Sequence, residues 1–384
     1  MSRLKRGSIA VVGVAESDLG EVAHGTSPVD LMAQATMRAL DDAGLSLSDI
    51  DGLFGAAAQV RFGPMVLAEY LGIQPKFFDG TQIGGSSFMT HLAHAQAAIE
   101  HGVCDVALIA YGSTQRSVSR SAASPPEFNP YETPYRPIFP ASAYALAAAR
   151  HMHEYGTTRE QLAEVAVAAR KWALLNPVAW EKEPLTIEQV LNSRMVSWPL
   201  TVRDCCLVVD GGGAMIVTSA SRARTLKKTP VYVLGVGESI SHASISSMPN
   251  LTVTAARDSG AAAYAMAGLQ ARDVDMVSLY DAFTITPILF LEDLGFCPKG
   301  QGGRFVADGG IAPGGKLAVN TNGGGLSYCH PGMYGLLVMV EAVRQVRGEC
   351  GARQVKDCRV ALAHGNGGVL SSQCTVLFGS PDVL

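Results

Sequence analysis

The chain has 384 residues, 48% of them apolar and 17% charged, and a formal net charge of −4 at pH 7. This length is too great for one ordinary core and predicts two fused domains or a duplicated fold. The weak negative charge excludes the basic footprint of a nucleic-acid-binding protein. No stretch approaches the ~18 apolar residues of a membrane-spanning helix.

The eight cysteines are scattered and form no C-x-x-C pair. In a long chain this scatter is typical of reduced, mostly buried thiols in a cytoplasmic protein, and it predicts no metal site.

The first predicted element is a strand at residues 8–15. Three basic residues before a short apolar run resemble a signal peptide. The run, however, has only about eight residues, and Glu16 and Asp18 follow it at once. We therefore expect this run to be part of the fold.

An internal repeat follows. Residues 43–53 read AGLSLSDIDGL and residues 267–277 read AGLQARDVDMV, with seven of eleven positions identical or near-identical. Each segment follows an alanine-rich stretch of helical character, at 29–42 and 258–266, and leads into an apolar run. The sequence therefore predicts a helix, a glycine turn and a strand, twice.

The repeat continues at 84–112 and again at 323–368. Each of these segments contains a glycine turn, a helix that ends at glycine and a buried strand rich in Val, Ala and Leu. Helices that alternate with short apolar runs indicate α/β layers with largely parallel strands. In such a fold we expect both glycine turns, and the strand ends near Tyr280 and His364, to meet where the two halves join.

The repeat divides the chain into an N-terminal half, 1–227, and a C-terminal half, 228–384. Residues 113–205 are predicted to be an inserted loop domain within the first half. It begins with a loop rich in Pro, Ser and Tyr and continues with amphipathic helices, one starting at the capping-box pair Thr158 and Gln161. A long insertion of this kind typically forms a lid, a dimer contact or a substrate wall.

Four segments resemble the thiolase superfamily, and the similarity extends over nearly the whole chain. NTNGGGLSYCHPG (320–332) resembles the thiolase Asn-x-x-Gly-Gly … Gly-His-Pro segment, whose histidine is a catalytic base. SLYDAF (278–283) stands where thiolases have Asn-Glu-Ala-Phe and sterol-carrier thiolases have His-Asp-Cys-Phe. RDCCLVVDGGGAMIV (203–217) resembles the strand that closes the first half, and GGSSFMTHLAHAQAAIEHG (84–102) resembles the Cys-Ala-Ser-Gly nucleophile turn.

The resemblance implies a thiolase-like duplicated five-layer α-β-α-β-α architecture with an inserted loop domain. It also implies substrates that are coenzyme A thioesters, no permanently bound cofactor, and a homodimer or dimer of dimers. The apolar strand at 104–112 would lie close to the dimer interface.

The nucleophile turn of this chain contains no cysteine. The resemblance puts Gly85, to within one residue, where thiolases carry the acyl group. It puts His330 at the catalytic base, Tyr280 at the oxyanion-hole residue and His364 roughly at the second, proton-carrying cysteine. Cys329 replaces the glycine that precedes the catalytic histidine.

These correspondences define two sets of candidate residues. We expect the catalytic residues to be His330, Tyr280, His364 and Cys329, and the residues that contact the coenzyme A thioester to be Gly85, Ser86, Asn320, Gly324 and Gly367. Two of the catalytic candidates have alternative interpretations. Tyr280 is also compatible with an ordinary strand aromatic, and Cys329 with a buried structural thiol.

Other polar residues favour structural roles. Ser86 and Ser87 are expected to cap the helix that follows them, since serine without an adjacent base is a weak nucleophile. His91 and His94 resemble a metal pair, but no carboxylate accompanies them in the sequence, so we expect them to be packed or solvent-facing. Cys205–Cys206 are expected to pack in a buried strand.

Without a thiolate the covalent half-reaction of a thiolase fails, whereas an aldol or retro-aldol step needs only acid, base and enolate stabilisation. YDAFT, LEDLGFC and NTNGG resemble the thiolase-like aldolases that cleave steroid side chains from acyl-CoA. One catalytic tyrosine of those enzymes matches Tyr280, and another falls near Tyr328 or Cys329. Their active form pairs with a small partner that carries a zinc ribbon and an OB-fold.

The leading hypothesis is therefore a non-covalent carbon–carbon lyase or aldolase acting on a β-hydroxyacyl-CoA. One alternative is a thiolase-type acyltransferase in which Cys329 is a displaced nucleophile. The other is a non-catalytic carrier of acyl-CoA or lipid.

Overall fold

The two halves of the repeat form the same arrangement of strands. The computed structural model of the protein describes residues 4–118 and 129–384. The strands of the first half are β1 (Ile9–Glu16), β2 (Gly52–Gly55), β3 (Phe77–Asp79), β4 (Val106–Ser113) and β7 (Gly211–Ser219). Those of the second half are β8 (Val231–Ile240), β9 (Met276–Leu279), β10 (Ala318–Val319), β11 (Val360–Gly367) and β12 (Ser372–Gly379).

Strand order confirms the internal repeat. The described strands run in the order β1-β7-β4-β2-β3 in the first half and β8-β12-β11-β9-β10 in the second. The halves join where β1 pairs with β8 through two residue pairs, which makes one continuous sheet of the described strands. Each strand therefore has a counterpart at the equivalent position of the other half.

Within each half four of the five strands run in the same direction, as expected, and one strand is reversed. β7 is antiparallel to both β1 and β4, β12 is antiparallel to both β8 and β11, and only the outer pairings β4-β2-β3 and β11-β9-β10 are parallel. The reason is the connections: β12 follows β11 through a tight turn, and β7 follows the long insertion. Neither is reached through the crossover helix that parallel neighbours require.

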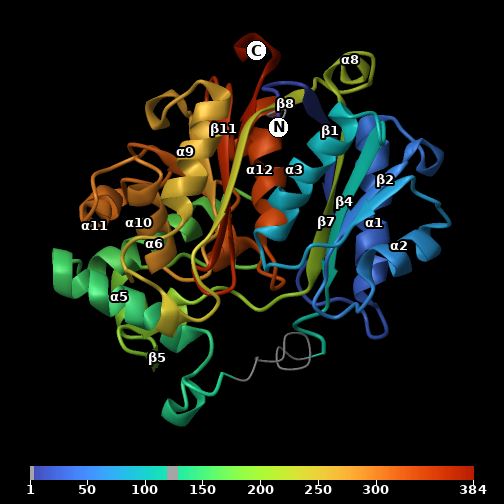
Figure 1. The fold of residues 1–384 in the computed structure, drawn as a ribbon. Coiled ribbons are helices and arrows are strands. Elements are labelled where there is room, and N and C mark those ends of the chain that lie inside the picture. Colours follow the sequence, from blue (N-terminus) through green and yellow to red (C-terminus); the bar gives the residue numbers. More distant parts are fainter. Residues whose placement is uncertain (1–3, 119–128) are drawn as a thin grey trace.

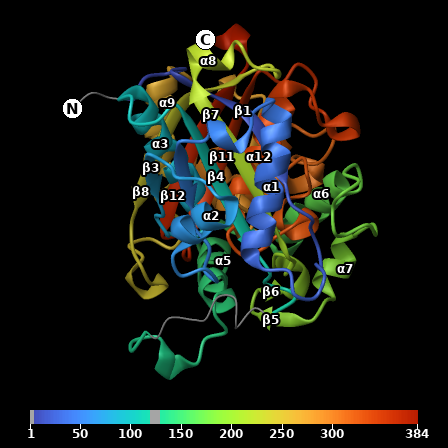
Figure 2. The same ribbon diagram turned by 90° about the vertical axis from the view of Figure 1, so that its right-hand side faces the viewer.

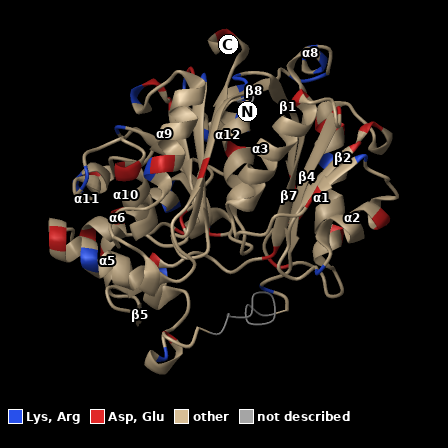
Figure 3. Ribbon diagram, viewed as in Figure 1, with Lys and Arg blue, Asp and Glu red and all other residues tan. Residues whose placement is uncertain are grey.

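The helices lie in three layers, and with the two parts of the sheet they form the expected five-layer α-β-α-β-α arrangement (Figure 1). The middle layer contains α3 (Ser87–Glu100) and α12 (Gly335–Arg347). The outer layers contain α1 (Pro28–Ala43) and α2 (Gly63–Leu71) on one side, and α9 (Ala256–Ala267) and α10 (Ile285–Asp293) on the other. Figure 3 shows the strands and the middle of the molecule mostly free of charged residues, which gather at the ends and on the outer helices.

Equivalent glycines let the outer helices approach the sheet. A Cβ atom on Gly13 of β1 would lie 2.1 Å from the carbonyl oxygen of Ala39, and one on Gly235 of β8 would lie 2.2 Å from that of Ala263. The helices then end at Gly44 and Gly268, both in the left-handed conformation, as the two AGL segments predicted. The repeat thus extends to the way in which the outer helices pack against the sheet.

The insertion lies at the lower end of the molecule, beside α10 and α11 (Gly302–Val306) (Figures 1 and 2). Its elements are α5 (Ala141–Tyr155), α6 (Arg159–Ala173), α7 (Ile187–Leu191), β5 (Met195–Ser197) and β6 (Leu200–Thr201). Thr158 and Gln161 form the predicted capping box of α6. A short α8 (Ala220–Ala223) leads from β7 towards the second half.

The expectation that Cys205–Cys206 pack in a buried strand is wrong. Cys205–Cys206 are partly exposed and lie in irregular chain before β7, joined to the second half by an isolated bridge from Cys205 to Phe283. The strand expected at 104–112 is β4, which pairs with β7 and β2, and the free edge of the first half is β3; the expected place of β4 close to a dimer interface stays a prediction. Among the described residues no helix is long and apolar enough to cross a membrane.

Candidate functional site

Four chain segments meet between the halves, as the repeat predicted. They are the glycine turn before α3, the loop after β9, the segment before α12 and the end of β11. A Cβ on Gly367 would lie 1.7 Å from the carbonyl oxygen of Ile83, and one on Gly335 would lie 1.9 Å from that of Gly85. Such close contacts are possible only between backbones.

Three rings form an aromatic cluster at this junction. The ring centroid of His330 lies 5.4 Å from that of Tyr280, edge to face, and 5.9 Å from that of Tyr334, nearly parallel. All three side chains are buried, with exposed fractions of 5% for Tyr280, 6% for His330 and 1% for Tyr334. The predicted pair Tyr280 and His330 is therefore brought together, and the sequence did not single out Tyr334.

Tyr280 is held in place through its hydroxyl. The hydroxyl donates to the carbonyl oxygen of Gly332 at 2.6 Å and accepts the N–H of Tyr334 at 3.3 Å. Burial raises the pKa of Tyr280 well above its ordinary value. At neutral pH the side chain is therefore a neutral phenol that can donate a hydrogen bond, and it is a poor source of phenolate.

The ring of Tyr280 also fills the space beside Gly85. A Cβ atom on Gly85 would lie 2.0 Å from Cε2 of Tyr280 and 2.7 Å from the carbonyl oxygen of Asn366. Gly85, which the resemblance puts within one residue of the thiolase nucleophile, therefore has no room for a side chain.

Asp281 fixes the turn that leads to His330. This turn is one turn of π-helix at Gly324–Tyr328. The N–H of Gly325 donates to Asp281 Oδ1 at 2.6 Å, and the N–H of Leu326 to Oδ2 at 3.3 Å. Burial raises the pKa of this carboxyl group to about 7. Gly324 has a φ of 62°, and a Cβ there would lie 2.0 Å from Asp281 Oδ2, so the carboxylate occupies the space that a larger residue would need.

The asparagines of NTNGG hold backbone. Asn320, with a φ of 53°, accepts the N–H of Leu279 on Oδ1 at 2.6 Å. Asn322 accepts the N–H of Gly324 at 2.9 Å and the hydroxyl of Tyr334 at 3.2 Å. Asn320 and Gly324 thus shape the turn, and their predicted contact with the thioester stays a prediction.

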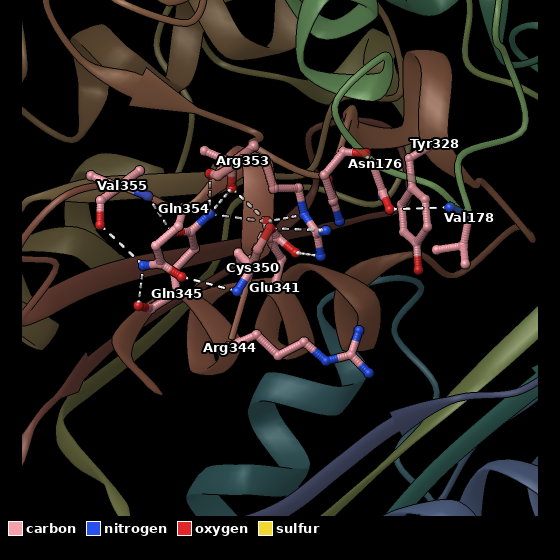
Figure 4. A network of polar contacts seen from close by, with 12 residues as sticks. Asn176, Val178, Tyr328, Glu341, Arg344, Gln345, Cys350, Arg353, Gln354 and Val355 are labelled. Carbon is pink, nitrogen blue, oxygen red and sulfur yellow. Dashed lines mark hydrogen bonds and ion pairs between the residues drawn. The ribbon is translucent and has the colours of Figure 1, made fainter. Parts of the chain in front are cut away.

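A buried network of polar contacts anchors the NTNGG segment (320–324) to α12 (Figure 4). Glu341 accepts hydrogen bonds from Arg353 Nε and Nη2, both at 3.0 Å, and from Thr321 Oγ1 at 2.6 Å. Gln345 donates to Thr321 Oγ1 at 2.9 Å. The carboxylate is compensated by a guanidinium and by neutral donors, as a buried charge requires, and Thr321 lies beside the asparagines that shape the turn.

The insertion forms the other support of the turn. The N–H groups of Trp180 and Glu181 donate to the carbonyl oxygens of Tyr328 and Ser327 at 2.9 and 3.0 Å. Arg170 of α6 donates from Nε to Ser327 Oγ at 3.0 Å. The insertion is therefore part of the wall around the candidate site.

His364 does not join the aromatic cluster, because the strand that contains it is longer than expected. β11 continues to Gly367, and the ring of His364 points to the outer face, 4.6 Å from the ring of Phe290 in α10. Its nitrogens make hydrogen bonds of 2.9 Å with Thr375 and Gln373. Burial lowers its pKa to about 3, so the ring is neutral. Its backbone carbonyl accepts the N–H of Tyr280 at 2.9 Å.

Cys329 and Cys206 lie in different environments. Cys329 is fully buried, and burial, followed by the charges of Glu16 and Asp210, raises its pKa well above the ordinary value. Its environment therefore disfavours a thiolate. Cys206 is partly exposed, and its backbone N–H donates at 2.9 Å to the carbonyl oxygen of Ala282, two residues after Tyr280.

Ser86 and Ser87 do not cap α3. Ser86 Oγ donates to the carbonyl oxygen of Ile83 at 3.0 Å and shares a hydrogen bond of 2.9 Å with Ser372 Oγ, and Ser87 Oγ accepts the N–H of Ile83 at 2.8 Å. Ser86 is itself in a helical conformation, so neither hydroxyl bonds to a free N–H of the first turn. Ser86 instead ties the glycine turn to β12.

His91 and His94 do have a carboxylate nearby, contrary to the sequence expectation. Asp79 forms an ion pair with His94. His91 is buried, its Nε2 lies 3.0 Å from the carbonyl oxygen of Thr81, and burial lowers its pKa to about 4. Within residues 4–118 and 129–384 no group of three or more side chains is arranged to hold a metal ion.

A surface cleft of about 790 Å³ lies apart from the aromatic cluster. Several of its charged lining residues form ion pairs, as Glu16 does with Arg344 and Asp18 with Arg38. None of the candidate residues lines it. The cluster between the halves therefore remains the candidate site.

The fold and the site define a thiolase-type enzyme, and the chain belongs to the thiolase superfamily. The family model for a thiolase C-terminal domain-like region matches residues 237–380. The chain is 36% identical, over 89% of its length and 92% of the relative's, to 17-hydroxy-3-oxo-4-pregnene-20-carboxyl-CoA lyase of Mycobacterium tuberculosis. It is 34% identical, over 96% and 99%, to an acetyl-CoA acetyltransferase of Methanothermobacter thermautotrophicus.

A solved structure, that of the Ltp2-ChsH2(DUF35) aldolase, superposes with a TM-score of 0.89 at 31% identity, covering 98% of this chain and 99% of that one. The relatives thus include both a lyase or aldolase and an acyltransferase, and both named relatives act on coenzyme A thioesters. Fold and family are in accord with the sequence analysis.

Proposed function

We propose that this enzyme makes or breaks a carbon–carbon bond next to a coenzyme A thioester without forming a covalent acyl-enzyme. The observation that carries the proposal is that Gly85, where a nucleophile is expected, has no side chain and that the ring of Tyr280 fills the space beside it. The site retains a phenol and an imidazole, which suit proton transfer and hydrogen bonding in an aldol or retro-aldol step.

In the cleavage direction the substrate is a β-hydroxyacyl-CoA. His330 removes the proton of the β-hydroxyl group, whose oxygen becomes a carbonyl oxygen as the Cα–Cβ bond breaks. The electron pair of that bond passes into the thioester enolate, and the phenol of Tyr280 stabilises the enolate oxygen by exchanging its hydrogen bond with Gly332 for one with the substrate. Protonation at Cα then gives the shortened acyl-CoA.

Tyr334 orients both catalytic groups. It stacks against His330 and donates its N–H to the hydroxyl of Tyr280. His364 assists only through its backbone carbonyl, which fixes the main chain of Tyr280. We expect Gly85, Ser86, Asn320, Gly324 and Gly367 to contact the thioester when it binds, and coenzyme A enters as part of the substrate rather than as a bound cofactor.

The acyltransferase alternative requires a thiolate. Cys329 is the residue that the sequence offers for this role, and its burial beside Glu16 and Asp210 opposes ionisation. The carrier alternative predicts binding of acyl-CoA without turnover.

We propose that a second copy of the chain binds at the β3 edge. An unpaired edge strand presents backbone donors and acceptors that a second strand can satisfy, and exposed apolar side chains lie on this edge and on α2 nearby: Met65, Val66, Tyr70 and Phe78. Size-exclusion chromatography with light scattering tests this, and Phe78→Asp should convert the dimer to a monomer.

We further propose a small partner protein with a zinc ribbon and an OB-fold. The solved aldolase neighbour is named as a complex of Ltp2 with ChsH2(DUF35). The insertion exposes Tyr131, Tyr135, Ile138, Phe139 and Trp198, which gives it an apolar surface suited to such a partner. Co-purification with the product of the neighbouring gene tests this proposal.

The function is tested by supplying β-hydroxyacyl-CoA and β-ketoacyl-CoA substrates of increasing chain length, with and without the partner. We expect a carbonyl product and a shortened acyl-CoA from the β-hydroxy series. His330→Ala should lower kcat by about 10²–10⁴-fold. Thiolysis of the β-keto series by free coenzyme A, with no cleavage of the β-hydroxy series, would contradict the proposal.

A further inference from the structure

The contact between Gly85 and Tyr280 is steric on both sides. The φ of Gly85 does not lie in the left-handed region, so its backbone conformation is open to any residue. Only space requires glycine there: a Cβ would lie 2.0 and 2.8 Å from Cε2 and Cδ2 of Tyr280 and 2.7 Å from the carbonyl oxygen of Asn366. Both distances to the ring are below those that real Cβ atoms adopt.

The ring of Tyr280 cannot move aside at low cost. Its hydroxyl bonds to Gly332 and Tyr334, and its ring packs edge to face against both His330 and Tyr334. Moving the ring would leave buried polar groups without partners and would open a cavity in the cluster. The ring and a side chain at position 85 therefore exclude one another.

We infer that Gly85 and Tyr280 act as one coupled determinant of the reaction class. This inference rests on the proposed function and names the residues that make the reaction non-covalent. Together, Gly85 and Tyr280 exclude the formation of an acyl-enzyme. Exchanging both, with Gly85→Cys and Tyr280→Ala, opens a covalent acyl transfer that neither exchange permits alone.

The covalent step in the double variant balances as follows. The introduced sulfur attacks the carbonyl carbon of acetyl-CoA, a new C–S bond forms, and the bond from that carbon to the coenzyme A sulfur breaks. The thiol proton passes through His330 to the departing sulfur. The products are an acetylated enzyme and free coenzyme A.

The steric part is tested by a thermal double-mutant cycle. Gly85→Ala should lower the melting midpoint by about 2–6 °C, because it overfills a packed site. In the Tyr280→Ala background the same change should lower the midpoint by clearly less, because the clash with the ring is gone and only the contact with the carbonyl oxygen of Asn366, at 2.7 Å, remains. If Gly85→Ala yields no folded protein, restoration by Tyr280→Ala replaces the midpoint as the readout.

A matched control is Gly55→Ala, since a Cβ there would meet only ordinary contacts, the nearest being the carbonyl oxygen of Ala110 at 3.5 Å. Its effect should be the same in both backgrounds, because distant sites without shared partners are additive. An equal loss of stability from Gly85→Ala in both backgrounds would overturn the coupling.

The chemical part is tested with acetyl-CoA and peptide mass spectrometry on the wild type, the two single variants and the double variant. We expect an acetyl group at position 85 in the double variant alone. A folded double variant that shows the steric coupling but takes no acetyl group would overturn the role in reaction class. An acetylated wild type would overturn the proposed function while leaving the steric coupling intact, so the two failures are distinguishable.

Discussion

Asp281 is expected to make the protein less stable as the pH rises through the neutral range. The carboxyl group is buried beneath the turn that carries His330, and burial raises its pKa to about 7, from an ordinary value of about 3.9. Between these values the folded state binds a proton that the unfolded state has released. Stability therefore falls as the pH rises from about 4 to about 7 and is level above that. A shift of about three units corresponds to about 4 kcal/mol.

Asp281→Asn removes the titration and keeps the size of the side chain. The amide nitrogen cannot accept a hydrogen bond, so one of the N–H groups of Gly325 and Leu326 loses its partner, which adds a cost independent of pH. Urea unfolding at pH 5, 6, 7 and 8 measures both effects. The wild type should lose about 3 kcal/mol relative to the variant between pH 5 and pH 8.

The control variant is Asp308→Asn, which replaces an exposed carboxylate. The stability of this variant should follow that of the wild type at every pH. A difference between wild type and Asp281→Asn that stays constant with pH, or that grows as the pH rises, would refute the reasoning.

Three other changes test the site and its support. Tyr280→Phe should lower kcat for the β-hydroxyacyl-CoA by about 10²-fold or more, with little change in circular dichroism, because it removes the donor to the enolate oxygen; unchanged kcat would exclude that role. Arg353→Met should lower the free energy of unfolding by about 3 kcal/mol, measured in urea, since it leaves the carboxylate of Glu341 without its guanidinium; a loss below about 1 kcal/mol would contradict this. Iodoacetamide should alkylate Cys206 well before Cys329, as followed by peptide mass spectrometry, and the reverse order would show that burial does not govern these thiols.

Local patterns were sufficient to predict the duplicated fold. The AGL segments end their helices at glycines in the left-handed conformation, a preference that depends on one residue and its neighbours. The reversed direction of β7 and β12 was not predictable in this way, because these two strands take their direction from partners far apart in sequence or from a turn, and both directions suit the same apolar run.

The sequence also predicted which segments meet at the site, but not which face of each segment points inward. The glycine-rich sequence after His364 predicted that the strand ends there, yet β11 continues for three more residues. Because side chains alternate along a strand, the ring of His364 lies on the outer face. Cys329 and His330 are neighbours in sequence, but Cys329 lies near Glu16 and Asp210, whereas His330 contacts Tyr280.

Tyr334 and Asp281 were not identified from the sequence. Tyr334 lies in PGMYG, directly after the matched histidine. The only signal in the sequence for its role was that an aromatic residue lies close to a catalytic motif. Asp281 follows Tyr280 inside a matched motif, but its role depends on two backbone N–H groups from a turn more than forty residues later.

The most direct test of the central claim is to incubate the wild-type enzyme, with its partner where one is required, with a cleavable β-hydroxyacyl-CoA. The products and the intact mass of the protein are then followed through the first turnover. We predict equal amounts of a carbonyl product and a shortened acyl-CoA, with the mass of the protein unchanged and the cleavage lost in His330→Ala. Accumulation of an acylated protein before product release would contradict the account.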